Sequence, residues 1–266
     1  ILLSSMEEQM EFDILLAEIK KKKELSGLSN ILIAESLNNY LNKNRIQISK
    51  LSSLSNRDKK FIVKEIRLNL RLLHGRFQAS TKNREKMLSQ GKIKNLLMTH
   101  SSTKERIDSY PKIKSLISKL NVKSILDLGC GLNPIALASK DTSYFAYDIN
   151  EAELSIIKDF FKKNNIQGEV HFYDITKFKR EDFPQADICL LLKIFDILKK
   201  RGYKLIESIL SGIQCKHILV SFSTKKLSGK KMNQPKRNWF EDTLKKLNYT
   251  FEIIKTENEI FYLIVK

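Results

Sequence analysis

Two glycines directly after an apolar run are the residues of this sequence best suited to bind a ligand. Residues 125–128 form the apolar run, and Gly129 and Gly131 follow it in a Gly-x-Gly pattern. Glycine lets the backbone approach a ligand closely, and open parallel sheets bind their ligands at the carboxyl ends of the strands. A dinucleotide fingerprint continues with a third glycine and a helix N-terminus, whereas Leu-Asn-Pro follows here. The loop therefore predicts a ligand site that is not a phosphate cradle.

Three acids near the ends of consecutive apolar runs extend this candidate site. Asp127 lies in the run before the glycines, and Asp148 ends the next run, 21 positions later, where a carboxylate can accept hydrogen bonds from two ribose hydroxyls. Asp174 ends the run after that, and with Ile175 it suits an adenine amino group beside an apolar wall. Each acid alone is more simply a helix cap or a turn residue. All three behind Gly-x-Gly favour a nucleoside site.

Short apolar runs alternate with helical patterns from residue 124 onward, and these elements must position the candidate residues. Alternating strands and helices imply crossover connections and a parallel sheet. The helical patterns lie at 151–164 and 203–211. The expected strands are 124–128, 143–148, 169–173, 188–193 and 217–222, and the runs 250–255 and 260–265 flank a polar turn and so predict a terminal hairpin.

This order of elements is typical of class I S-adenosylmethionine (SAM) methyltransferases. Their fold is a Rossmann-like, mostly parallel, seven-stranded sheet that ends in an antiparallel hairpin. The first 98 residues carry only helical patterns, at 7–24, 30–41, 56–73 and 84–98. We therefore expect an α/β fold of this class over residues 99–266, preceded by an all-helical N-terminal domain over residues 1–98. The fold alone does not establish a function.

The formal net charge is +18 over 266 residues, and the excess lies in two blocks. Residues 41–100 carry +12 and residues 216–237 carry +7, whereas the stretch 101–215 carries only +3. The first block is helical, and turn residues from Ser223 onward predict a long loop in the second. A Lys-rich face is as easily a solvated surface as a binding surface. The total charge alone allows a membrane surface, an acidic protein or nucleic acid as the partner.

Composition excludes several classes of protein. Hydrophobic residues make up 42% of the chain, which is too many for a disordered protein. The three cysteines, Cys130, Cys189 and Cys215, are too few and too scattered for a disulfide scaffold or a zinc site. Each lies in or beside an apolar run, where cysteine behaves as a small hydrophobe, so we expect a reducing cytosol and no metal. No apolar run reaches 18 residues, so we expect no membrane-spanning helix.

The residues at the end of the fourth expected strand bear on which atom is methylated. Enzymes that methylate exocyclic amines of bases commonly carry an Asn/Asp-Pro-Pro-Tyr/Phe box there, where this chain has Leu-Leu-Leu-Lys at 190–193. Methylation of a pyrimidine carbon needs an exposed cysteine, and Cys189 lies inside an apolar run. A ring nitrogen such as guanine N7 has its own lone pair and needs only alignment with the methyl group and exclusion of water. The absence of an obvious general base is therefore compatible with activity, and we expect no catalytic acid or base.

Three segments follow one another in this chain: His-Ser-Ser-Thr-Lys-Glu-Arg at 100–106, Leu-Asp-Leu-Gly-Cys-Gly-Leu-Asn-Pro at 126–134 and Ser-Phe-Ser-Thr-Lys-Lys-Leu-Ser-Gly at 221–229. With these segments, the sequence from about residue 45 onward resembles the Arm/Rmt aminoglycoside-resistance family, which methylates N7 of a guanine in the decoding site of 16S rRNA. The glycine motif is generic to methyltransferases, whereas the Ser-Thr-x-Glu-Arg, Gly-Leu-Asn-Pro and Ser-Phe-x-Thr-x-x-Leu-Ser-Gly segments in this order are specific to the family. The resemblance lies in residues 100–106, 126–134, 146–148, 190–193, 221–229 and 258–262.

The resemblance implies that SAM is the cofactor and assigns it a set of contacts. Arg106 would pair with the methionine carboxylate, a task suited to a guanidinium fork. Gly129 would lie against the methionine part, Asp148 would bind the ribose, and Asp174 with Ile175 would bind the adenine. The expected cofactor residues are Arg106, Asp127, Gly129, Gly131, Asp148, Asp174, Ile175 and Leu191.

The resemblance also implies a pocket for the target base. The loop 221–229 would help to place a flipped-out guanine, since a base inside a duplex cannot reach such a pocket. The chain departs from the usual family sequence near this pocket: Asp196 and Ser223 stand where proline is usual, and residues 230–237 differ as well. The cofactor site therefore matches the family more closely than the target pocket does. The expected pocket residues are Leu191, Leu192, Lys193, Ser221 and Phe222.

The resemblance makes the N-terminal helical domain the ribosome-binding part, and this domain coincides with the +12 block. We expect rRNA phosphates to contact cations from both basic blocks. The expected RNA-binding residues are Arg67, Arg71, Arg76, Lys82, Arg84, Lys92, Lys94, Lys225, Lys226, Lys230, Lys231 and Arg237.

The main hypothesis is a SAM-dependent guanine-N7 methyltransferase of small-subunit rRNA. It implies the small ribosomal subunit as partner, no membrane or DNA partner, a monomeric chain in the cytoplasm, and aminoglycoside resistance. Two alternatives stay open: a non-catalytic ribosome-binding or assembly protein that retains the fold, and a methyltransferase of a different RNA. A methyltransferase of proteins or small molecules would leave both basic blocks unexplained.

Overall fold

The structure is a computed structural model that describes residues 6–73, 83–225, 232 and 235–266. The chain forms two compact units. A helical unit comprises residues 1–81 with 150–152, and a sheet unit comprises residues 82–149 and 153–266. No described helix is long and apolar enough to cross a membrane.

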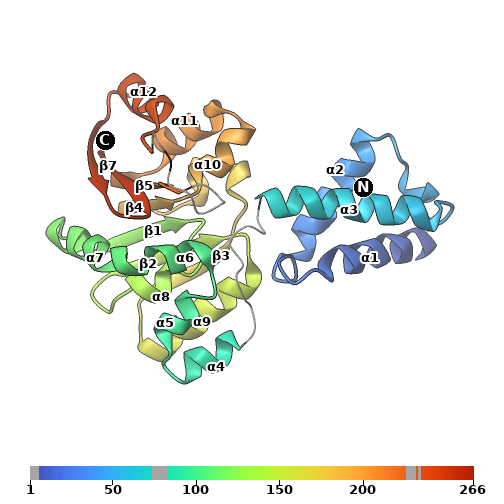
Figure 1. Cartoon of the computed structure of the whole chain (residues 1–266), viewed down its shortest axis with the longest axis horizontal. Helices are drawn as coiled ribbons and strands as arrows, with labels where there is room; N and C mark the ends of the chain where they lie inside the picture. Colours follow the sequence, from blue (N-terminus) through green and yellow to red (C-terminus); the bar gives the residue numbers. More distant parts are fainter. Residues whose placement is uncertain (1–5, 74–82, 226–231, 233–234) are drawn as a thin grey trace. The chain divides into compact units, whose positions relative to one another are not determined.

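Seven strands form one sheet in the order β3-β2-β1-β4-β5-β7-β6 (Figure 1). Five of them pair in parallel: β1 (Ser124–Leu128), β2 (Ser143–Asp148), β3 (Gly168–Phe172), β4 (Ala186–Leu192) and β5 (Cys215–Ser223). The last two, β6 (Thr250–Lys255) and β7 (Glu259–Val265), form an antiparallel hairpin, and β7 also pairs antiparallel to β5. This topology confirms the predicted class I methyltransferase fold.

Helices cover both faces of the sheet (Figure 1). One hydrophobic core includes α5 (Ile93–Leu97), α7 (Tyr110–Lys119), α8 (Asn133–Leu137) and α9 (Glu151–Asn164). The other includes α10 (Phe195–Leu198), α11 (Tyr203–Gly212) and α12 (Asn238–Lys246). Along β4, Ile188 and Leu190 face the first core, whereas Cys189 and Leu191 face the second. Strands buried on both faces read as continuous apolar runs, which is why the sequence located them.

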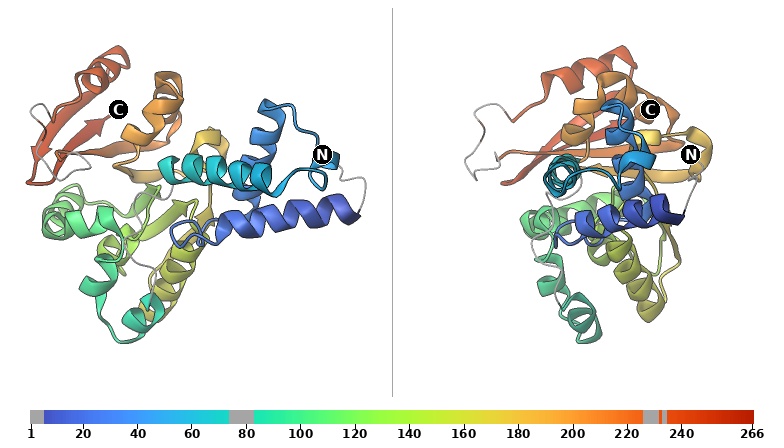
Figure 2. Two further views of the ribbon diagram at one scale, coloured as in Figure 1. Left: turned by 45° about the vertical axis from the view of Figure 1, so that its right-hand side comes forward. Right: turned by 90° about the vertical axis from the view of Figure 1, so that its right-hand side faces the viewer.

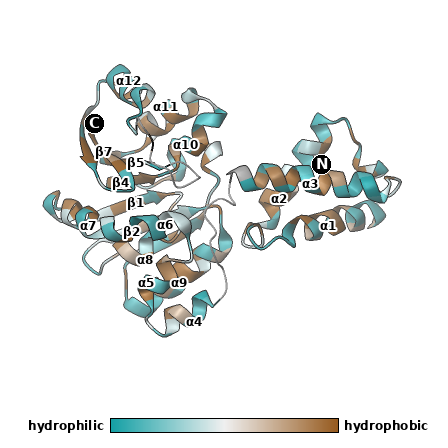
Figure 3. Cartoon of the chain, viewed as in Figure 1, coloured by the Kyte–Doolittle hydropathy of each residue, from teal (hydrophilic) through white to brown (hydrophobic). Residues whose placement is uncertain are grey.

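The helical unit contains α1 (Met6–Lys20), α2 (Asn30–Lys43), the short 3-10 turn η1 (Ile48–Lys50) and α3 (Asn56–Leu73). α1 and α3 lie side by side (Figure 2). Both helices mix hydrophobic and hydrophilic residues along their whole length (Figure 3), as expected for helices that bury one face. Ser29 caps α2, because its side chain accepts a hydrogen bond from the backbone N–H of Leu32.

The division of the chain into two compact units falls between residues 81 and 82, whereas the sequence suggested a division at 98. The stretch expected as one helix at 84–98 is two short helices, α4 (Arg84–Ser89) and α5, separated at Gly91 with φ +68°. Leu88 of α4 and Leu96 of α5 pack in the core of the sheet unit. These apolar contacts explain why residues 82–98 group with the sheet.

Candidate functional site

The two glycines after β1 have backbone conformations that favour glycine. Gly129 has φ +67° and Gly131 has φ +49°, a region that residues with a Cβ rarely adopt. A Cβ on Gly129 would lie 2.4 Å from Cδ1 of Ile194, and one on Gly131 would lie 3.0 Å from Cε1 of His100. The backbone N–H of Gly129 donates to the carbonyl oxygen of Tyr147 at 2.8 Å. The loop is therefore held against β2, where its backbone can approach a ligand.

Asp148 lies beside this loop at the end of β2. Its Oδ2 accepts a hydrogen bond from the N–H of Gly131 at 2.8 Å, and its Oδ1 accepts one from the N–H of Ile149 at 2.7 Å. The side chain is half-buried. The carboxylate is thus fixed in orientation and keeps an exposed part, as a group that binds ribose hydroxyls requires.

Asp174 lies two residues beyond β3, where it caps the short 3-10 turn η4 (Ile175–Lys177). Its Oδ1 accepts hydrogen bonds from the N–H and the Oγ1 of Thr176, at 3.0 and 2.8 Å. Ile175 is half-buried and packs on the second core. Asp174 therefore has the capping role that was the simpler explanation from sequence, and its Oδ2 has no hydrogen bond to a described residue.

Asp127 is in a different environment, because it is fully buried. Burial raises its pKa to about 7, although the hydroxyl of Tyr144 donates to its Oδ2 at 2.7 Å and opposes the shift. Asp127 joins β1 to β2 through Tyr144. Its position suits support of the loop rather than contact with a ligand.

Arg106, the last residue of α6 (Ser101–Arg106), is 1% exposed and lies in a buried polar network. Its guanidinium forms an ion pair with Glu259 at 3.0 Å and donates to Asn133 Oδ1 at 2.6 Å. The hydroxyl of Tyr110 donates to the same Asn133 oxygen at 2.9 Å. Glu259 and Asn133 lie in segments that carry the family resemblance, but no local pattern places them beside Arg106.

Lys193 follows β4 and binds the same carboxylate. Its Nζ lies 3.3 Å from Oε1 of Glu259 and also pairs with Glu105. The residue has φ +62° and is 7% exposed, a strained conformation for a residue with a side chain. Its N–H donates to the carbonyl oxygen of Ser221 at 3.0 Å, which fixes the ends of β4 and β5 together.

The other expected pocket residues lie in the strands. Leu191, Leu192, Ser221 and Phe222 are all buried. The Oγ of Ser221 has no hydrogen-bond partner among the described residues. Among the described residues, no group of three or more His, Cys, Asp or Glu side chains could hold a metal ion.

Comparisons with known proteins identify the family. Residues 82–264 match the family described as "Ribosomal RNA methyltransferase (FmrO)". That match spans more than half of the chain. The chain belongs to this family.

Relatives and solved structures agree with this assignment. A 16S rRNA (guanine(1405)-N(7))-methyltransferase of Serratia marcescens is 29% identical over 184 residues, which are 67% of this chain and 72% of the relative. The structure of the 16S rRNA methylase ArmA is 29% identical with a TM-score of 0.57, over 70% of this chain and 99% of ArmA. The 16S rRNA methyltransferase RmtF, in complex with S-adenosyl-L-homocysteine, has a TM-score of 0.76 at 17% identity, over 99% of this chain and 100% of RmtF. The chain spans about two thirds of the length of the curated relatives that it matches.

Membership of the FmrO family confirms the predicted Arm/Rmt-type resemblance and the predicted enzyme class, a SAM-dependent rRNA methyltransferase. The loop geometry is compatible with this cofactor, because Gly129 and Gly131 have positive φ and the carboxylate of Asp148 is fixed beside the loop by the N–H of Gly131.

The expected RNA-binding cations of this FmrO-family chain have different surroundings. Arg84 is 5% exposed, and its guanidinium pairs with Glu153 at 3.2 Å and donates to Oγ1 and O of Thr99. The expectation that Arg84 contacts phosphate is therefore wrong, because its charge is buried and neutralised inside the sheet unit. Lys92 and Lys94 are exposed. Arg76, Lys82, Lys226, Lys230 and Lys231 lie outside the described residues.

Four further candidates make contacts within their own unit. Arg67 donates to the carbonyl oxygens of Glu18 and Ile19, and Arg71 pairs with Glu24. Arg237 pairs with Asp196 at 2.8 Å, and its guanidinium lies over the ring of Phe222. Lys225 lies 3.4 Å from the exposed carboxylate of Glu257. The side chain of Arg71 is 45% exposed and that of Lys225 is 31% exposed, so these two cations are weakly held, whereas the side chain of Arg237 is only 11% exposed.

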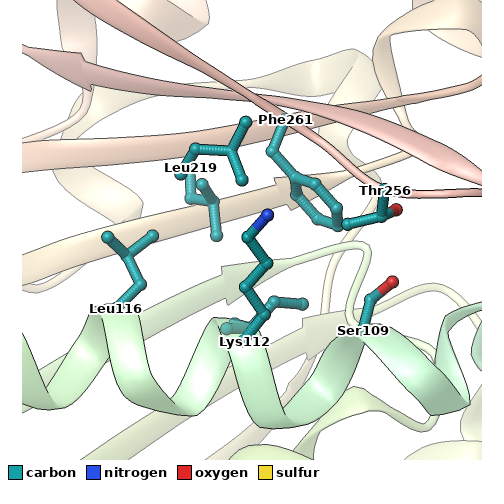
Figure 4. Close-up of a pocket in the computed structure, with 8 residues that line it drawn as sticks. Ser109, Lys112, Leu116, Leu219, Thr256 and Phe261 are labelled. Atoms are coloured by element: carbon teal, nitrogen blue, oxygen red, sulfur yellow. The ribbon is translucent and has the colours of Figure 1, made fainter.

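A small apolar pocket lies between α7 and the strands β5, β6 and β7 (Figure 4). Lys112 lies across it and donates to the carbonyl oxygen of Lys255 at 3.3 Å. None of the expected cofactor residues lines this pocket. It is lined by Ser109, Lys112, Ile113, Leu116, Leu219, Ile254, Thr256 and Phe261.

Proposed function

We propose that this chain transfers a methyl group from SAM to N7 of a guanine in the decoding region of small-subunit rRNA. The observation that carries the proposal is the FmrO match over residues 82–264, which includes the glycine loop, Asp148 and Arg106. The Serratia relative is named for the same reaction and aligns over 67% of this chain. We propose further that the chain acts as a monomer in the cytoplasm and that the methylated subunits resist aminoglycosides.

The residues at the carboxyl edge of the sheet support a division of roles in this reaction. When bound, SAM supplies an electrophilic methyl group on its sulfonium. The backbone at Gly129 and Gly131 would contact the methionine part, Asp148 the ribose hydroxyls, and Asp174 with Ile175 the adenine. Arg106 already donates to Glu259, Asn133 and Ser102, and one N–H of its five remains to bind the methionine carboxylate.

The target nitrogen needs alignment rather than deprotonation. Guanine N7 attacks with its own lone pair, so the chain has to orient the base and exclude water. Lys193, with its fixed backbone and buried amine, would border the base together with the ends of β4 and β5. His100, whose ring lies beside Gly131, is buried, and burial lowers its pKa to about 3. An imidazole with so low a pKa is too weak a base to accept a proton near neutral pH.

The test is methyl transfer to purified small subunits with labelled SAM, followed by mapping of the labelled nucleotide by nuclease digestion and mass spectrometry. The proposal expects label at N7 of one guanine of the decoding region. Label on another RNA would show a methyltransferase with a different target. Binding to subunits without label would show the non-catalytic assembly role, and label on proteins or small molecules alone would overturn the proposal.

A further inference from the structure

The six cations between residues 57 and 71 of α3 fall into two groups, and the first group holds the helix in its own unit. The apolar face of α3 is buried through Ile62, Val63, Ile66 and Leu70. Three cations make contacts inside the unit: Lys59 with Glu11 at 2.8 Å, Arg67 with the last carbonyls of α1, and Arg71 with Glu24. These contacts join α3 to α1 and to the segment that follows α1.

The second group faces solvent. Arg57, Lys60 and Lys64 are exposed and form no ion pair with any described residue. Positions 57, 60, 61 and 64 are spaced by three or four residues, so they lie on one stripe of the helix. Phe61, on this stripe, is 56% exposed. With Asp58, these four residues line a shallow hollow of the surface.

The chemistry of this stripe is that of a surface for RNA. Exposed lysine and arginine side chains bind phosphates and release counterions, and an exposed aromatic ring offers a face on which an unpaired base can stack. Asp58 is the only acid in the hollow, and it accepts a hydrogen bond from the hydroxyl of Ser55. A membrane-binding helix needs a broad apolar face in the interface, but the apolar face of α3 is already buried within its unit.

We propose that Arg57, Lys60, Phe61 and Lys64 form a docking surface for rRNA of the small subunit, and this proposal rests on the proposed function. The three cations bind phosphates, and the ring of Phe61 stacks on an unpaired base of a loop or bulge. The site lies on the N-terminal half of α3. It does not use Arg67 or Arg71, which the sequence favoured.

The test measures the affinity of the full chain for purified small subunits over a range of salt concentrations. Lys60→Gln and Lys64→Gln should each lower the magnitude of the log–log salt slope by about 0.7 to 0.9. Phe61→Ala should weaken binding about fivefold or more at every salt concentration without a change of slope, and Phe61→Trp should restore it. Matched controls exist on α2, where Lys43 and Ile31 are also exposed; Lys43→Gln and Ile31→Ala should behave as the unchanged protein.

The outcomes distinguish a failure of the docking surface from a failure of the proposed function. If the unchanged protein methylates subunits and the stripe variants bind them with unaltered slope and affinity, the docking surface is wrong and the function stands. If the unchanged protein methylates no rRNA, the function itself fails. Loss of binding to anionic vesicles, or loss of self-association, in Phe61→Ala without loss of subunit binding would assign the stripe to a membrane or to a second copy and would overturn the proposal.

Discussion

At the residue scale, the charged side chains differ in whether they pair inside the fold or stay exposed to solvent. Arg84 and Arg106 are both almost fully buried, and each pairs with a buried carboxylate, Glu153 or Glu259. An unpaired charge in these places would be strongly destabilising. These partners lie 69 and 153 positions away in the sequence, so no local pattern could reveal them. The exposed cations, by contrast, remain available for a partner outside the chain.

Asp148 is the residue whose removal should most directly weaken SAM binding. Asp148→Ala removes a carboxylate that is fixed by the N–H groups of Gly131 and Ile149. Because hydrogen bonds to a charged group contribute about 1.5–3 kcal/mol, we expect SAM affinity to fall about tenfold or more. Titration calorimetry measures it, with Asp141→Ala on the exposed turn before β2 as a control. Equal affinities of the two variants would remove Asp148 from the ribose site.

His100 and Asp127 should affect the pH dependence of stability in opposite directions. Burial lowers the pKa of His100 from 6.5 to about 3, so only the unfolded chain binds that proton in between, and stability falls as the pH drops below 6.5. Burial raises the pKa of Asp127 from 3.8 to about 7, so the folded chain keeps that proton, and stability falls as the pH rises from 4 to 7. The two effects oppose each other between pH 4 and 6.5.

Single substitutions should separate these two titrations. His100→Gln leaves the effect of Asp127, so the variant should gain stability relative to the unchanged protein as the pH falls from 6.5 to 4.5. Asp127→Asn should show the reverse trend. Each change of slope is at most about 1.4 kcal/mol per pH unit, and urea unfolding at several pH values measures it. Parallel pH profiles for both variants and the unchanged protein would contradict the buried titrations.

At the element scale, the sequence predicted the strands better than the helices and the site. β1, β2 and β6 begin and end where the apolar runs do. β1 and β2 lie inside the sheet, whereas β6 is an edge strand whose residues are exposed or half-buried. α7 and α12 were missed, although Pro111 near the start of α7 and the apolar spacing of Phe240, Leu244 and Leu247 are helix signals. The glycine loop and Asp148 follow from local pattern. The network of Arg106 does not, because it is built from three distant segments.

Two residues at positions where the chain departs from the family sequence, Asp196 and Arg237, form an ion pair. Asp196 of α10 accepts two hydrogen bonds from Arg237, at 2.8 and 3.1 Å, and Arg237 also donates to the carbonyl oxygens of Ser223 and Pro235. This pair joins α10 to the end of β5 and the start of α12.

We expect Asp196→Asn and Arg237→Gln to be non-additive, with a coupling of about 0.5–1 kcal/mol in thermal unfolding, because Asp196 is partly solvent-exposed. Both should raise KM for small subunits and leave SAM affinity unchanged, since neither residue is among those expected to contact SAM. The more exposed Lys236→Gln serves as the control. Additive single effects would show that the pair does not act as a unit.

We expect the carboxylate of Glu259, the first residue of β7, to be essential for stability. Glu259→Gln leaves Arg106 buried without its carboxylate and Lys193 with only the exposed Glu105. Breaking a buried pair in this way costs about 3–5 kcal/mol, which urea unfolding measures. Glu257→Gln, two residues earlier and largely exposed, should change stability by less than about 0.5 kcal/mol. Equal unfolding midpoints for the two variants would show that Glu259 does not stabilise the network.

At the scale of the whole molecule, the cations behind the net charge of +18 are of two kinds: some are paired within the fold and others are exposed to solvent. Arg67, Arg84 and Arg237 contribute to the fold, whereas the exposed stripe on α3 and the exposed Lys92 and Lys94 can contact phosphate. The net charge therefore overstates the number of RNA contacts.

We expect the salt dependence of methylation to report the true number of contacts. Three contacts from the α3 stripe alone predict that kcat/KM for small subunits falls with a log–log slope of about −2 or steeper, at about −0.7 to −0.9 per contact. SAM affinity, measured in the same buffers, should change little, because Asp148 is held by backbone groups. A flat dependence of kcat/KM on salt would show that cations do not drive subunit recognition.

The ion pair between Arg106 and Glu259 also has a consequence for synthesis of the chain. Arg106 precedes the first strand, whereas Glu259 begins the last, and the two are 153 positions apart. A chain emerges from the ribosome N-terminal part first, so the glycine loop, β1 and β2 are made long before the carboxylate that neutralises Arg106. The ion pair of Arg106 with Glu259 therefore forms only when β7 has been synthesised and inserted between β5 and β6. A chain that stops before residue 259 has every residue expected to touch SAM, but its Arg106 lacks the carboxylate that neutralises it.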